Sequence, residues 1–216
     1  EVVSQLGRLA RLRQLDDGTR LFAQGDEADG LYGVLRGQVR ISSQGADGRE
    51  LLVNVFEPGG WFGEISMFDD LPRTHDAAAQ GATDLLLIPK REFRALLEAD
   101  PGLYPHFMRM LCRKLRRSFG YIESAAFLPL RGRLAYRLAE LVELHGQANP
   151  DGSVTIGLHL PQDELARMVN AARPSVSREL KTLEADGLIA LAYGEIRVLD
   201  AQRLAAVAEG QTSSRR

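Results

Sequence analysis

The feature that most constrains this chain is a change of sequence pattern at Pro89. Between residues 21 and 89, glycine recurs at short intervals and separates short apolar runs such as residues 31–35, 51–56 and 85–88. Runs of this length bounded by turn residues predict many short antiparallel strands, and therefore a barrel or jelly roll. We expect the tightest hairpin turns at residues 35–39 and 44–48.

Beyond Pro89 glycine becomes scarce and apolar residues recur every three or four positions, which indicates helices. Residues 91–97 are predicted to form a short helix that ends before Asp100-Pro101, because a residue that precedes proline avoids the helical region. A longer pattern predicts one continuous helix up to Leu128-Pro129, with an apolar stripe formed by Leu103, Phe107, Leu111, Leu115, Ser118, Ile122 and Ala125. Pro129 can begin the next helix, so Leu128-Pro129 is a candidate hinge.

The apolar stripe of this long helix is more extensive than one neighbouring element could cover, while the opposite face carries five basic residues between 109 and 117. We therefore expect a two-fold dimer seam with the character of a coiled coil, formed by Phe107, Leu111, Leu115 and Ile122. The alternative is a helix that packs only against its own barrel.

The remaining segment predicts three helices and a terminal hairpin. The helices are expected at residues 133–144, 161–169 and 174–184, with Asn170 at positive φ in a tight turn, Pro174 at the first helical position and Gly187 ending the third helix. Residues 188–198 then fold back as two strands around Tyr193-Gly-Glu195. Two helices joined by a short turn and followed by a β-hairpin indicate a winged helix-turn-helix.

Composition is that of a water-soluble globular protein, with 44% hydrophobic and 26% charged residues and a net charge of −2. No apolar run is long enough to span a bilayer, and the first residues lack the pattern of a signal peptide, so we expect a cytoplasmic protein without a membrane partner. The single cysteine, Cys112, excludes an internal disulfide and any cysteine-rich metal site.

Three motifs in order resemble the cyclic-AMP receptor and fumarate–nitrate regulator (Crp/Fnr) superfamily of bacterial transcription factors. They are the glycine skeleton Gly25, Gly37, Gly48 and Pro58-Gly59, the cassette Phe62-Gly-Glu-Ile-Ser66 with Leu71-Pro-Arg-Thr74, and the pair Gln162-Asp-Glu-Leu-Ala166 with Arg173-Pro-Ser-Val-Ser-Arg178. The resemblance implies an α+β fold with a cyclic-nucleotide-binding-type β-roll over residues 1–100, a dimerisation helix over 101–128 and a DNA-binding winged helix-turn-helix over 129–205. Residues 206–216 are expected to form a disordered tail.

The effector pocket implied by this resemblance comprises Gly63, Glu64, Ile65, Arg73, Thr74 and Ser118. Gly63 would let the backbone approach a ligand, Glu64 would accept a ribose hydroxyl, and Arg73 would pair with a cyclic phosphate. Thr74-His75-Asp76 and Phe119 depart from the pattern of cyclic-AMP binders. Cyclic AMP, cyclic GMP, a cyclic dinucleotide and another small molecule therefore all stay open as effectors, as does a vacant roll held by a Glu64–Arg73 pair.

Some members of the superfamily sense gases or redox state through a bound iron–sulfur cluster or haem, and this sequence lacks the residues that would hold such a group. Iron–sulfur sensing needs several cysteines and only Cys112 is present. His75 and His106 are the only candidates for an axial haem ligand in the first 128 residues, and no cofactor motif surrounds them. We expect no metal and no haem.

The expected DNA surface lies on the third helix of the winged domain, which would enter the major groove. The resemblance places Arg173 and Arg178 on base-reading positions, where each could bond bidentately to guanine. Contacts to phosphates or flexible base contacts are expected from Ser175, Ser177 and Lys181, and wing contacts from Tyr193 and Arg197. The alternative is a solvated face in which Glu179 and Glu184 pair with Arg178 and Lys181.

These observations predict a homodimeric regulator that binds a palindromic operator in double-stranded DNA under the control of a small-molecule effector, and that contacts RNA polymerase if it is an activator. The alternatives are a cyclic-nucleotide module that acts through protein contacts, or a regulator with a vacant pocket. An enzyme is not indicated, because His145, His159 and the acidic residues form no catalytic spacing. Residues 129–216 hold 11 basic and 11 acidic residues, so DNA binding depends on where the charges lie and not on their sum. We expect the basic side chains to share one face, formed by Arg173, Arg178, Lys181 and Arg197. The acidic side chains of Glu140, Glu143, Asp151 and Asp200 are expected to lie elsewhere.

Overall fold

The computed structural model describes residues 7–192 and 194–210. The chain forms two compact units whose boundary falls inside the long helix, between Arg113 and Lys114. Each unit has its own sheet and its own buried core. None of the helices in the described residues is long and apolar enough to cross a membrane.

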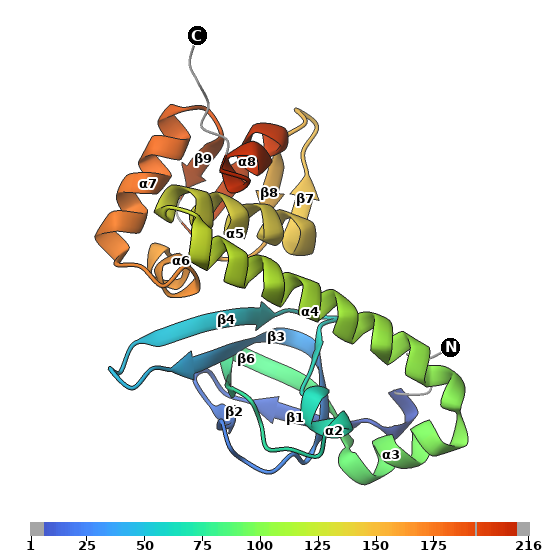
Figure 1. Ribbon diagram of the computed structural model, residues 1–216. Helices are drawn as coiled ribbons and strands as arrows, with labels where there is room; N and C mark the ends of the chain where they lie inside the picture. Colours follow the sequence, from blue (N-terminus) through green and yellow to red (C-terminus); the bar gives the residue numbers. More distant parts are fainter. Residues whose placement is uncertain (1–6, 193, 211–216) are drawn as a thin grey trace. The chain divides into compact units, whose positions relative to one another are not determined.

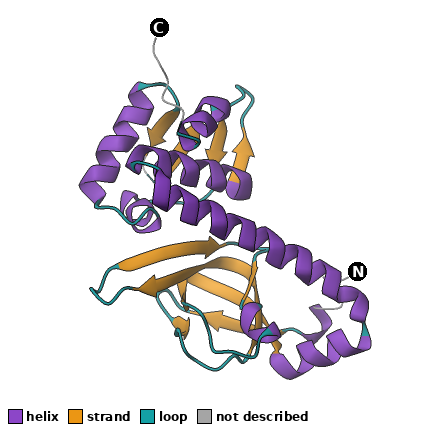
Figure 2. Ribbon diagram, in the orientation of Figure 1, coloured by secondary structure: helices purple, strands orange, loops and turns teal. Residues whose placement is uncertain are grey.

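The first unit is built on six antiparallel strands (Figures 1 and 2). Four strands form the order β1-β6-β3-β4, while β2 pairs with β6 and β5 pairs with β3. The bounds are β1 (Arg11–Leu15), β2 (Arg20–Phe22), β3 (Gly30–Gln44), β4 (Glu50–Phe56), β5 (Trp61–Phe62) and β6 (Asp76–Pro89). Helices α2 (Ile65–Phe68) and α3 (Lys90–Ala99), the 3-10 turn η1 (Pro101–Leu103) and the first half of α4 (Tyr104–Phe127) complete the unit.

One of the two expected hairpin turns is wrong. Residues 35–39 lie inside β3, which continues through them and shifts its register against β6 on either side of Arg36. Gly37 has φ +74, and a Cβ there would lie 2.5 Å from the carbonyl oxygen of Ala82. The glycine therefore forms a bulge that bends one long strand. The other expected turn is confirmed, because β3 ends at Gln44 and pairs with β4 from Glu50.

Two buried clusters hold the first unit together. Inside the sheet, the ring of Tyr32 stacks on that of Phe62 with their centroids 5.5 Å apart. A second cluster joins α3 to the start of α4, where Phe107 packs edge-on against Phe93 with a centroid separation of 5.2 Å. Phe107 is only 7% exposed, so its expected place in a dimer seam is wrong: α3 already covers it.

The second unit combines the end of α4 with a helical domain and a small sheet (Figure 1). Its helices are α5 (Leu130–His145), α6 (Gln162–Met168), α7 (Arg173–Ala185) and α8 (Ala201–Ala208). Strands β7 (Gly146–Ala148), β8 (Val154–Ile156), β9 (Ile189–Ala192) and β10 (Glu195–Val198) form an antiparallel sheet in the order β7-β8-β10-β9. The helices meet in a core that includes Leu134, Leu138, Leu165, Val176, Leu180 and Leu204.

The helix-turn-helix follows the expected pattern closely. Asn170 has φ +47 in the turn between α6 and α7, and Gly187 has φ +71 just beyond α7. Helix α7 begins one residue before Pro174, which therefore takes the second helical position. The break between α4 and α5 falls at Leu128-Pro129.

Two elements were not expected from the sequence. The hairpin of β7 and β8 adds two strands to the expected wing. Helix α8 runs to Ala208 and buries Val207, so the expected start of a tail at residue 206 is wrong. Residues 211–216, where the rest of that tail was expected, lie outside the described residues.

Candidate functional site

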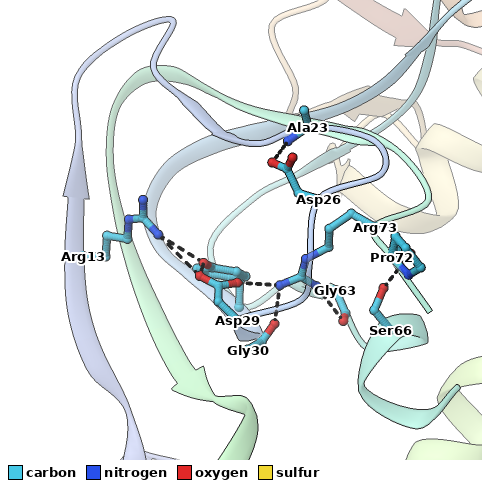
Figure 3. Close-up of polar contacts among 10 residues, drawn as sticks. Arg13, Ala23, Asp26, Asp29, Gly30, Gly63, Ser66, Pro72 and Arg73 are labelled. Carbon is cyan, nitrogen blue, oxygen red and sulfur yellow. Dashed lines mark hydrogen bonds and ion pairs between the residues drawn. The ribbon is translucent and has the colours of Figure 1, made fainter. Parts of the chain in front are cut away.

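Arg73 is the centre of the candidate effector pocket in the first unit. Its side chain is 2% exposed and donates from Nη1 to the carbonyl of Gly63 (2.9 Å) and from Nη2 to the carbonyl of Gly30 (2.6 Å). Nη2 also lies 2.8 Å from Oδ1 of Asp29 (Figure 3). Three segments that are distant in sequence, at residues 29–30, 63 and 73, therefore converge on one guanidinium.

The loops around Arg73 are fixed by backbone hydrogen bonds. The amide of Arg73 donates to the carbonyl of Asp26, and the amide of Gly25 donates to the carbonyl of Arg73, each at 2.8 Å. On either side, Asp26 accepts from the amide of Ala23 and Ser66 donates to the carbonyl of Pro72 (Figure 3). These bonds fix the backbone on both sides of Arg73.

Two features require glycine at position 63: the positive φ of its backbone and the closeness of the Arg73 guanidinium. It has φ +87, and a Cβ would lie 2.6 Å from Nη1 of Arg73. Any side chain at this position would displace the guanidinium. The resemblance implied that Gly63 lets the backbone approach a ligand closely. Among the described residues, the group that lies closest to Gly63 is the guanidinium of Arg73.

The guanidinium of Arg73 also lies against two aromatic rings. Its central carbon is 4.4 Å from the ring centroid of Phe22 and 5.6 Å from that of Tyr32, distances at which a cation is attracted to the π face. Its Nε is buried and has no hydrogen-bond partner among the described residues. Arg73 is thus a buried cation with a donor still available.

The acidic partner of Arg73 is Asp29 and not Glu64. Asp29 is half-exposed, accepts the hydroxyl of Tyr32 at 2.5 Å, and lies 3.7 Å from Nη1 of Arg13. Burial, followed by the hydrogen bond to Asp29, holds the pKa of Tyr32 well above its ordinary value, so the phenol keeps its proton. Glu64 is buried immediately before α2, and the expected pair of Glu64 with Arg73 is replaced by the Asp29–Arg73 pair.

The residues that follow Arg73 have polar partners of their own. Thr74 is exposed, with its hydroxyl 2.8 Å from Nδ1 of His75, and burial lowers the pKa of His75 against the opposing charge of Asp76. The carboxylate of Asp76 accepts the amide of Gln24 at 2.8 Å. Asp76 therefore has a backbone donor of its own.

The other two residues of the expected pocket lie on helices. Ile65, at the start of α2, is 42% exposed. Ser118 lies on α4 within the second unit, where its hydroxyl donates to the carbonyl of Lys114 at 3.1 Å.

The exposed face of α7 is the candidate nucleic-acid interface. Val176, Leu180 and Leu183 are buried against the rest of the unit, which leaves Arg178 and Lys181 exposed. No hydrogen bond or ion pair links these two side chains to any described residue. Ser175 and Ser177 are half-buried on the same helix, and Tyr193, expected on the wing, lies outside the described residues.

Two of the expected basic contacts are paired with acids. Arg173 has Nε 3.4 Å from Oδ1 of Asp163, and Arg197 has Nη1 3.4 Å from Oδ2 of Asp151. The expectation that Asp151 lies away from the basic residues is therefore wrong, because the hairpins of the four-stranded sheet bring it to Arg197. Glu184, expected to pair with the cations of α7, accepts the amide of Leu191 at 2.9 Å.

A stripe of exposed apolar side chains runs along α4. It comprises Met108, Leu115, Phe119 and Ile122, which are 53–59% exposed, and we call it the α4 stripe. Leu115 and Ile122 were expected there, Leu111 is half-buried, and Met108 and Phe119 were missed. Among the described residues, no group of three or more His, Cys, Asp or Glu could hold a metal ion.

Comparisons with known proteins match both units. Residues 12–100 match the cyclic nucleotide-binding domain family, and residues 132–207 match the Crp-like helix-turn-helix domain family. A CRP-like cAMP-activated global transcriptional regulator of Mycobacterium tuberculosis is 31% identical over 188 residues, which cover 87% of this chain and 84% of the relative.

Solved structures give the same result. A transcriptional regulator of the CRP/FNR family from Thermus thermophilus is 29% identical, with a TM-score of 0.71 and coverage of 94% of this chain and 100% of the other. A c-di-GMP responsive global regulator from Xanthomonas campestris is 25% identical, with a TM-score of 0.72 and coverage of 92% and 98%. The chain belongs to the Crp/Fnr superfamily and is an effector-controlled, DNA-binding transcriptional regulator of a class that is not enzymatic.

Proposed function

We propose that the first unit binds a cyclic nucleotide whose phosphate is recognised by Arg73. The observation that carries the proposal is the buried guanidinium with an available Nε donor, held between two carbonyls and two aromatic rings. A planar guanidinium matches a phosphate better than a point charge does, and burial strengthens the interaction. Gly63, Glu64, Ile65 and Thr74 would contact the ribose and phosphate around it.

The first experiment asks which cyclic nucleotide the first unit binds. The Mycobacterium relative is described as cAMP-activated and the Xanthomonas relative as c-di-GMP responsive, so both ligands are relevant probes. We would titrate the full chain with cyclic AMP, cyclic GMP and cyclic di-GMP by calorimetry. We expect saturable binding of at least one of them, and a loss of about tenfold or more with Arg73→Gln, because a charge-assisted bond contributes about 1.5–3 kcal/mol.

The matched control is Arg49→Gln. Arg49 is an exposed arginine in the turn between β3 and β4, and it pairs with Asp47. We expect this variant to bind as the unmodified chain does. Equal affinity in the Arg73 and Arg49 variants would contradict the assignment.

A second candidate is a regulator whose pocket needs no nucleotide. The Asp29–Arg73 pair favours it, because a carboxylate already supplies the charge that a phosphate would supply. No heat with any of the three nucleotides, together with operator binding by the chain alone, would support this candidate.

For the second unit we propose that α7 enters the major groove of double-stranded DNA. Arg173 and Arg178 would contact base edges. Phosphates or flexible base positions would be contacted by Lys181, Ser175 and Ser177, and the DNA backbone by Tyr193.

The α4 stripe would form the interface of a homodimer, because exposed apolar side chains at this spacing suit a two-fold helical contact. A two-fold dimer requires a palindromic operator with half-sites roughly 34 Å apart. Any contact with RNA polymerase would follow from such an operator complex.

A further inference from the structure

The second unit contains a cavity of about 150 Å³ where three helices meet. It lies between the end of α4, the start of α5 and the α6–α7 turn, and it is lined by residues of all three segments. An apolar cavity of this size can accept benzene. This one has polar walls, so its chemistry differs from that of a packing defect.

The walls supply positive charge that is only partly compensated. Arg137 is buried, donates from Nη1 to Oε2 of Glu140 at 2.5 Å, and lies with Nε 3.4 Å from Sδ of Met168. Arg133, one turn earlier on α5, has a buried Nε without a hydrogen-bond partner among the described residues. No ion pair links Arg133 to a described residue. An unpaired buried donor on a cation is costly unless something accepts from it.

Two phenols complete the polar wall. Tyr121 on α4 and Tyr136 on α5 both line the cavity, and burial is the largest cause that raises the pKa of each, so both hydroxyls keep their protons. The charges of Arg137 and Arg133 act on Tyr121, and those of Glu140, Arg137, Glu143 and Glu123 act on Tyr136. Tyr121 is thus influenced by cations alone, which makes it the phenol better suited to lie beside a bound anion.

We infer that this cavity is a second ligand site, which binds a small organic anion through Arg133 and Tyr121. The shared chemistry is an oxyanion, either a carboxylate or a phosphate, attached to a body no larger than a six-membered ring. A guanidinium accepts either group in a planar, bidentate geometry. The inference does not depend on the proposed nucleotide site, because none of the residues that line this cavity belongs to the first unit.

The position of the cavity suggests what its ligand would do. Asn170, which lines it, is the positive-φ residue of the helix-turn-helix, and its lining residues on α4 and α5 come from the two sides of the Leu128-Pro129 break. A side chain on Gly120 of α4 would overlap the hydroxyl of Tyr136, so α4 and α5 are in close contact here. A ligand that touches α4, α5 and the turn stabilises the arrangement in which they surround it, and so shifts the population of α7 orientations.

The test uses the full chain and three defined probes. We would titrate it by calorimetry with benzoate, with benzamide, which has the same shape without the charge, and with inorganic phosphate. We expect benzoate or phosphate to bind saturably below about 10 mM, a weak but specific affinity, and benzamide not to bind. Saturation by benzoate alone identifies a carboxylate ligand, and saturation by phosphate identifies a phosphate ligand. Failure of both anions to saturate in this range, or equal binding of benzamide, would overturn the inference.

Variants separate this site from the rest of the molecule. Arg133→Gln should weaken anion binding by about tenfold or more, while Arg203→Gln on α8 should leave it unchanged. Any phosphate that binds at Arg73 would be lost in Arg73→Gln and retained in Arg133→Gln, so the two variants distinguish the two sites. If Arg133→Gln does not fold, Tyr121→Phe keeps the ring and removes one donor, and should weaken binding about three- to tenfold. Unchanged anion affinity in the folded variants at Arg133 and Tyr121 would overturn the inference.

Discussion

Arg73 is a cation held almost entirely out of water, and its environment has to offset the cost of that burial. Two carbonyls, two aromatic faces and one carboxylate do so within the first unit. Of these, only the carboxylate of Asp29 carries a full charge, and its side chain is half-exposed to solvent. Asp29 is therefore the partner that an incoming phosphate could replace.

Replacing Asp29 by asparagine should separate stability from ligand affinity. The Asp29→Asn variant leaves the charge of Arg73 buried without a carboxylate, which should lower the free energy of unfolding by about 1–2 kcal/mol, less than for a fully buried pair because Asp29 is half-exposed. The same change removes a negative charge beside the phosphate, so nucleotide affinity should rise. Urea unfolding and calorimetry measure the two effects. A variant that binds the nucleotide more weakly would show that Asp29 orients Arg73 and does not compete with the ligand.

Comparing alanine variants of Gly63 and Gly59 tests whether the close approach of Arg73 to Gly63 matters for ligand binding. Both have φ near +90, but a Cβ on Gly63 would lie 2.6 Å from Arg73, whereas nothing lies within 4 Å of one on Gly59. Alanine at either position should cost about 1 kcal/mol or more through backbone strain. Only Gly63→Ala should also abolish nucleotide binding, as judged by calorimetry. Equal binding by the two variants would show that Arg73 tolerates displacement.

His75 should make the first unit sensitive to acid. Burial lowers its pKa in the folded chain below the ordinary value of 6.5, so the unfolded chain takes up the proton first. The contribution of neutral His75 to stability is complete above pH 6.5 and is lost as the pH falls through the lowered folded value. Thermal unfolding between pH 7.5 and about 5 should show a steeper loss in the unmodified chain than in His75→Gln. His106→Gln, at an exposed position on α4, is the control, and identical pH profiles for all three would refute the effect.

At the scale of elements, sequence patterns predict which segments are helices or strands better than they predict which face each one buries. The stripe on α4 is wide enough to include both Phe107 and Met108, and the packing of α3 decides that Phe107 is covered. A glycine at position 37 is compatible with either a hairpin turn or a bulge, because both need positive φ. Only the long pairing of β3 with β6 shows that it forms a bulge. The Asp29–Arg73 pair joins residues that no local pattern connects. By contrast, Asn170 and Gly187 fix the ends of α6 and α7 locally, and both were predicted.

The two faces of α4 should respond differently to mutation. Ile122→Glu places a charge on the exposed stripe and should convert a dimer into a monomer with little change in the unfolding of the first unit. Phe107→Ala removes a buried ring that packs on Phe93 and should destabilise that unit by about 3–5 kcal/mol. Light scattering gives the mass and urea unfolding gives the stability. A dimer that survives Ile122→Glu would contradict the seam.

The exposed cations of α7 should contribute to DNA binding in two distinct ways. Arg178→Ala should cost about 1–3 kcal/mol per half-site on the specific operator and much less on random duplex. Lys181→Ala should weaken both by similar amounts and reduce the salt dependence, because a phosphate contact carries no sequence information. Fluorescence anisotropy with both duplexes measures these losses. Equal losses on the two duplexes for both variants would contradict the assignment.

At the scale of the whole molecule, charge placement matters more than net charge. The chain has 27 basic and 29 acidic residues, and two of the candidate DNA contacts, Arg173 and Arg197, are held by Asp163 and Asp151. These acids have to release their partners when phosphates or bases arrive. Arg178 and Lys181 have no such competitor among the described residues. Affinity for random DNA should therefore be weak and should fall steeply as salt rises.

We expect a ligand at Arg73 to control the affinity of α7 for DNA. The most direct test is the anisotropy of a selected palindromic duplex, titrated with the chain in the presence and absence of the cyclic nucleotide that binds it. Coupling of the usual size predicts that the nucleotide changes the DNA affinity of the unmodified chain by about 5- to 150-fold, and that Arg73→Gln shows no change. An affinity that is the same with and without nucleotide in the unmodified chain would contradict the account.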